Sequence, residues 1–185
     1  MKATASIAWL LAGLLVTGTV PAKSSNVTDP DAPRSLPADG AVAVQWTDPA
    51  QFNEILRSSN PWEARRGTWV ADLAKYLRKR ASTRLPTGER LEVTITDIER
   101  AGEFEPWHGA QASSIRYMRD IYPPRIALDF KLVGADGEVL AQGSRKLSDL
   151  GYLQRTMRPT NSDSLRYEKQ LIDDWLREEF GKPAA

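Results

Sequence analysis

The chain has 185 residues, with 25 basic and 24 acidic side chains, one histidine and no cysteine. A nearly neutral chain is not a general polyanion binder, so we predict no nucleic-acid partner. The absence of cysteine excludes disulfides, thiolate metal sites and cysteine nucleophiles, and packing alone must stabilise the single domain that this length allows.

The N-terminus has the pattern of a secretory signal peptide. Lys2 precedes a short apolar run over residues 7–16, and small residues lead to Ala22. The run is much shorter than the ~20 residues of a membrane span, so we expect cleavage after Ala22 and no transmembrane segment in the product. The product is expected to be periplasmic or secreted, and it cannot be lipid-anchored because it has no cysteine.

Residues 23–40 are rich in Pro, Ser and Asp and show no apolar period, which predicts a flexible lead-in. A single α+β domain is expected over residues 41–182. It begins with a strand at 41–48, where Val42, Val44 and Trp46 alternate with polar or small residues.

The first main helix is expected between Asn60 and Ala81. Asn60 and Pro61 are typical of a helix start, and from Thr68 the apolar residues recur at three- and four-residue spacing. Gly67 is placed to interrupt this helix, so its regular part is expected to begin at Thr68.

The remaining strands and the second helix are also predicted from the spacing of apolar residues. Strands are predicted at 91–96, 125–133 and 139–147, the last two joined as a hairpin, and a second main helix at 165–180. The order β-α-β-β-β-α predicts an α+β two-layer sandwich. It would have about four mostly antiparallel strands, with the two main helices on one face.

The candidate site lies in the long connection around residues 97–130. It holds the only histidine, four acids in nine residues, a tryptophan and a Tyr-Pro-Pro entry to a strand. The candidate binding residues are Asp97, Glu99, Glu103, Glu105, Trp107, His108, Tyr122 and Arg125.

The chemistry of these residues leaves several alternatives. The acids could gather Ca²⁺, but they do not follow an EF-hand pattern, and a solvated loop or pairing with arginines such as Arg119 is favoured. We therefore predict no metal and no cofactor. His108 could be a general base, yet no hydrolase, phosphate-loop or dinucleotide motif accompanies it, which favours a surface-loop histidine.

A glycosidase pair of Glu103 and Glu105 is also disfavoured. The two would share one face of a strand, whereas glycosidase carboxyls stand ~5–10 Å apart across a substrate. Trp107 and Tyr122 could flank a groove, although closure of the open end of the core is favoured. Pro123 and Pro124 fix an extended entry to the strand, with a cis bond left open at either.

Three segments carry a resemblance to a known family: AGEFEPW (101–107), YPPRIALDF (122–130) and RYEKQLIDDWL (166–176). With the signal peptide they resemble small exported bacterial proteins classed only as a domain of unknown function. The resemblance covers about residues 41–180. It implies a Gram-negative cell-envelope setting and assigns no catalytic residue.

The leading hypothesis is a periplasmic, non-catalytic binding or interaction module of the cell envelope, whose partner is an envelope protein or a small ligand. One alternative is an envelope hydrolase that uses His108 and acids of the 97–105 loop. The other is a cation-stabilised structural protein. The oligomeric state is left open.

Overall fold

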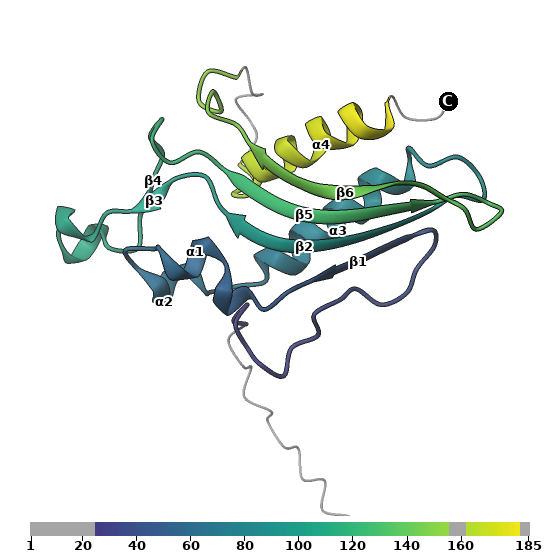
Figure 1. Cartoon of the computed structure of the whole chain (residues 1–185). Helices are drawn as coiled ribbons and strands as arrows, with labels where there is room; N and C mark the ends of the chain where they lie inside the picture. The colour runs from purple at the N-terminus through teal and green to yellow at the C-terminus, as the bar shows by residue number, and fades with distance from the viewer. Residues whose placement is uncertain (1–24, 156–161, 182–185) are drawn as a thin grey trace, which may run out of the picture.

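The computed structural model describes residues 25–155 and 162–181, so the predicted signal peptide lies outside the described residues. The domain is α+β, as predicted, and is built on a four-stranded mixed sheet with the strand order β1-β2-β5-β6 (Figure 1). The strands are β1 (Val42–Trp46), β2 (Arg90–Glu99), β5 (Arg125–Val133) and β6 (Val139–Ser148).

The strand pairings explain why the sheet is mixed. β1 pairs with β2 in parallel, with Val44 opposite Val93, whereas β2–β5 and β5–β6 are antiparallel. Parallel neighbours need a crossover, and the long helix α3 (Trp69–Ser82) lies between β1 and β2 in the chain. The β5–β6 hairpin, predicted from the sequence, turns at residues 134–138.

The core lies between one face of the sheet and the two long helices, α3 and α4 (Arg166–Phe180). α3 contacts β1 and α4, and α4 contacts β5 and β6. Fully buried Leu73 of α3 and Ile172 of α4 belong to this core, and Phe130 of β5 packs edge-to-face on Trp175 at 5.9 Å. The opposite face of the sheet is polar: Gln45 Nε2 donates to Thr94 Oγ1 at 2.9 Å.

Several short elements were not in the predicted order. They are the helices α1 (Asn53–Leu56) and α2 (Pro61–Ala64), the two-residue strands β3 (Glu103–Phe104) and β4 (Arg116–Tyr117), and three 3-10 helices. The predicted cap is present, since Asn60 Oδ1 accepts from Glu63 N at 3.3 Å. Gly67, at φ 91°, separates α2 from α3. No cis peptide occurs in the described parts of the chain.

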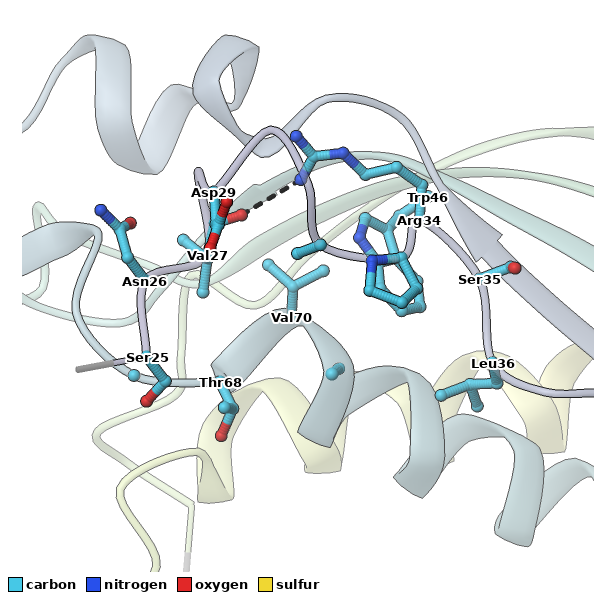
Figure 2. Close-up of a pocket in the computed structure, with 14 residues that line it drawn as sticks. Ser25, Asn26, Val27, Asp29, Arg34, Ser35, Leu36, Trp46, Thr68 and Val70 are labelled. Atoms are coloured by element: carbon cyan, nitrogen blue, oxygen red, sulfur yellow. Dashed lines mark hydrogen bonds between the residues drawn. The ribbon is translucent and has the colours of Figure 1, made fainter. Parts of the chain in front are cut away.

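Residues 25–40, which we expected as a flexible lead-in, run along the outer edge of β1. Leu36 N donates to Val44 O and Trp46 N to Arg34 O, so the segment satisfies backbone groups that β1 would otherwise expose. Figure 2 shows a pocket between this segment and α3, beside Trp46 and Val70. The pocket is mainly apolar and has a volume of about 290 Å³. The apolar side chains of Val27 and Leu36 pack on the core, so this otherwise polar stretch makes two apolar contacts with the domain.

Candidate functional site

The segment between β2 and β5 forms a small lobe beyond the end of the sheet, next to α1 and α2 (Figure 1). β3 and β4 pair antiparallel in it, with Glu103 opposite Tyr117. The 3-10 helices η2 (Pro106–His108) and η3 (Ala110–Ala112) make its tip. The lobe carries most of the predicted site residues.

A buried carboxylate attaches the lobe to the domain. Glu54 of α1 is only 3% exposed and accepts hydrogen bonds from Arg100 N (2.8 Å), Arg100 Nη2 (2.7 Å) and Arg116 Nη2. Arg116 also donates to Gly102 O at 2.7 Å. Gly102 has φ 77°, and a Cβ there would lie 2.8 Å from the Tyr117 carbonyl oxygen, so the turn requires glycine.

Glu105 is the centre of a second cluster in the lobe. It is 2% exposed and accepts from Arg119 Nη2 at 2.7 Å, His108 Nε2 at 2.8 Å and the Tyr122 hydroxyl at 3.1 Å. Burial acts to raise the pKa of Glu105, but the hydrogen bonds from Arg119, His108 and Tyr122 outweigh it and hold the pKa below its ordinary value. Glu105 is therefore ionised at neutral pH.

The ionised carboxylate fixes how His108 is protonated. Because Glu105 can only accept, the shared proton sits on His108 Nε2, which leaves Nδ1 as the acceptor of the neutral ring. The ring packs 5.0 Å from the Tyr117 ring and 6.1 Å from the Trp107 ring. This is a histidine–carboxylate pair, an arrangement that can orient a general base.

The other predicted residues do not join this cluster. Asp97 accepts from Asn53 N at 2.7 Å, Glu99 pairs with Arg125 at 2.8 Å, and Glu103 accepts from Phe104 N at 2.8 Å. In residues 25–155 and 162–181, no group of three or more acidic or histidine side chains is placed to hold a metal ion.

Large apolar side chains are exposed on and around the lobe. Trp62 and Trp107 are each 63% exposed, so Trp107 does not close the core as the sequence favoured. Six exposed large apolar side chains come from segments at this end of the domain, and we call them together the apolar end: Leu56, Trp62, Trp107, Ile115, Ile121 and Leu150. Hydrogen bonds join neighbouring segments of this region. Asn60 Nδ2, at the start of α2, donates to Ser113 O at 2.9 Å, and the Tyr152 hydroxyl, after β6, donates to Arg119 O at 2.9 Å.

Sequence reasoning missed part of this region. Leu56 and Trp62 lie in short helices with no periodicity, and Glu54 shows no local sign of burial. Arg119 was named only as one of several arginines that could pair with the acids. The signal that could have found the apolar end was a concentration of tryptophan and isoleucine outside every periodic segment.

Comparison with known protein families gives a match over most of the domain. A family model described as "Protein of unknown function (DUF3016)" matches residues 40–178. A search of curated proteins found no match. Within the described residues, no helix is long and apolar enough to cross a membrane.

Proposed function

The chain belongs to the DUF3016 family, and from that premise we propose that it is an exported, periplasmic interaction module of the cell envelope without catalytic activity. Its partner would be an envelope protein that binds the apolar end. In this proposal the domain acts as a two-layer sandwich whose sheet and long helices form a rigid base for the lobe.

The exposed apolar end is the observation that supports this function. Aromatic side chains are common anchors of protein interfaces, and several large apolar side chains exposed from neighbouring segments are typical of a binding surface. The surrounding polar groups are already paired: Arg66 lies 4.9 Å from the Trp62 ring centroid and bonds Glu63 at 3.0 Å. The surface therefore combines exposed rings with a charged margin, as interfaces do.

Photo-cross-linking in living Gram-negative cells tests the partner and the compartment together. A cross-linking amino acid at Trp107 should give a discrete adduct in the periplasmic fraction, and the mature N-terminus should be Lys23. The matched control is Val139, which is also exposed but lies at the start of β6, beside the β5–β6 turn and away from the lobe. Adducts from neither position, or equally from both, would contradict a binding surface at the apolar end.

The histidine–carboxylate pair favours the second candidate, an envelope hydrolase. His108 Nδ1 would accept the proton of an attacking water, with Glu105 holding the ring through Nε2. Neither residue lines the apolar pocket beneath residues 25–36. Hydrolysis of ester or glycan substrates that is lost in His108→Ala and retained in Trp107→Ala would support this candidate over the interaction module.

The third candidate is cation stabilisation, which the sequence raised from its acidic loop. The four acids bond four different sets of partners in the structure. A thermal melt that is unchanged in chelator would argue against it.

A further inference from the structure

Four arginines that are far apart in the sequence line one open pocket of about 700 Å³. Its wall residues come from α2, from the turn before α3, from the β2–β3 corner, from β4 and from the start of α4. The arginines are Arg66, Arg100, Arg116 and Arg166. The pocket falls in the range of about 300–1,000 Å³ that is typical of small-molecule sites. Neither Glu105 nor His108 lines it, so it is distinct from the cluster described above.

Positive charge in this pocket exceeds the negative charge that faces it. One carboxylate, Glu54, serves both Arg100 and Arg116. Arg66 is paired with Glu63 at 3.0 Å. Arg166 donates to the Asp163 carbonyl oxygen at 3.1 Å and lies 4.5 Å from the Tyr167 ring centroid. Its charge also acts on the Asp163 carboxylate, which is bonded by Lys169 at 2.5 Å.

One further acid lies buried beside the pocket. Glu168 is 1% exposed, and burial raises its pKa. Its Oε1 accepts from Ala101 N at 2.6 Å, and Ala101 lines the pocket. Burial also lowers the pKa of Arg100, and the charge of Arg116 acts in the same direction. Crowded, desolvated guanidinium groups are stabilised by any anion that reaches them.

We propose that this pocket binds the phosphate group of a small organic molecule. Guanidinium groups form paired, charge-assisted hydrogen bonds to phosphate oxygens. Arg100 Nη1 and Arg116 Nε take no part in the contacts to Glu54, and both arginines line the pocket. The pocket is larger than a phosphate ion needs, and Phe104 and Met118 add apolar wall for an organic body.

The arginines divide into two pairs by whether Glu54 binds them. Arg100 and Arg116 are each 16% exposed, are fixed by Glu54 and form the rigid floor of the site. Arg66 and Arg166 are held less tightly and lie at the margin, where they can adjust to the ligand. Replacement of the floor arginines would disturb the lobe itself, so the test uses the marginal pair.

Isothermal titration of the protein at fixed ionic strength tests the proposal with three probes: inorganic phosphate, glucose 6-phosphate and glucose. We expect glucose 6-phosphate to bind more tightly than phosphate, and glucose not to bind. Arg166→Gln and Arg66→Gln should each weaken glucose 6-phosphate binding about tenfold, as expected for the loss of one charge-assisted contact. The matched control is Arg90→Gln, an exposed arginine at the opposite end of β2 that makes the same change in net charge.

Each remaining outcome would overturn a defined part of the proposal. Failure of both phosphate compounds to bind would remove the phosphate site. Equal weakening by Arg90→Gln and Arg166→Gln would show general charge attraction instead of a pocket. Equal affinity for phosphate and glucose 6-phosphate would contradict the organic body and leave a site for the free ion.

Discussion

Replacement of Glu54 by glutamine should be the most damaging conservative change in the lobe. The carboxylate is 3% exposed and accepts from the backbone and guanidinium of Arg100 and from Arg116. A glutamine has nearly the same shape but no charge, and its amide group places a donor where two guanidinium groups need an acceptor. Two positive charges would then remain largely buried together with no carboxylate bonded to either.

The magnitude follows from the burial of the three partners. Removing one member of a buried ion pair costs about 3–5 kcal/mol of unfolding free energy, because the remaining charge is left desolvated. Arg100 and Arg116 keep 16% of their side-chain surface exposed, so some hydration can return and the lower end of the range applies. A loss of about 3 kcal/mol corresponds to a decrease of about 6–12 °C in Tm for a domain of this size.

Urea denaturation and thermal melting of the mature protein measure this loss. The matched control is Glu63→Gln, which removes a carboxylate from an ion pair whose arginine is 59% exposed and should cost less than about 1 kcal/mol. An unchanged urea m-value would show that stability changed and not the compactness of the unfolded state. If Glu54→Gln costs no more than Glu63→Gln, the ion pairs of Glu54 do not stabilise the fold and this reasoning is refuted.

Three further predictions concern single side chains. Because the pKa of Glu105 is lowered, the stability that its carboxylate contributes is present above its ordinary pKa and is lost as pH falls through the folded pKa. Glu105→Gln should therefore have a lower Tm than the wild type at pH 7, and its Tm should fall less than that of the wild type on acidification. Because the pKa of Glu168 is raised by burial, its stabilisation is present at low pH and is lost as pH rises through the folded value. Between the ordinary and the folded pKa of Glu168, the free energy of unfolding of Glu168→Gln should rise relative to that of the wild type by up to about 1.4 kcal/mol per pH unit. Urea titrations at several pH values measure this difference. Trp107→Ala should change the free energy of unfolding by less than about 0.5 kcal/mol, because the ring is largely in water. The same substitution should weaken partner binding in a pull-down. A larger loss of stability would show that the ring packs in the fold.

The regular elements could be predicted because their side chains repeat with a period. The strand predicted at 125–133 is β5 as observed, and the helix predicted at 165–180 differs from α4 by one residue at its start. In both, burial against one face selects apolar residues at every second or every third and fourth position. Gly67 interrupts the first helix region for an equally local reason, its positive φ.

The lobe could not be predicted in this way because its contacts are long-range. β3 and β4 have two residues each, too few for any period to show. Glu54 reads as a solvent-exposed residue of a short helix, yet its partner Arg116 lies 62 positions later in the chain. The sequence placed Glu105, His108 and Tyr122 in one candidate site, and they do meet, but the same reasoning grouped them with Asp97, Glu99 and Glu103, which bond elsewhere.

The net charge of the whole chain does not reveal how charge is distributed locally in the folded protein. Equal numbers of acidic and basic residues argue against long-range attraction to polyanions, because that field sums over the whole surface. A pocket depends only on the few charges that line it, and these come from positions as distant as Arg66 and Arg166. Only Glu54 and Glu63 pair with these arginines, and other acids in the count pair elsewhere: Glu99 with Arg125 and Glu179 with Arg145. A neutral chain can therefore hold a cationic pocket, and the ligand class that composition excludes for the surface remains available to a folded site.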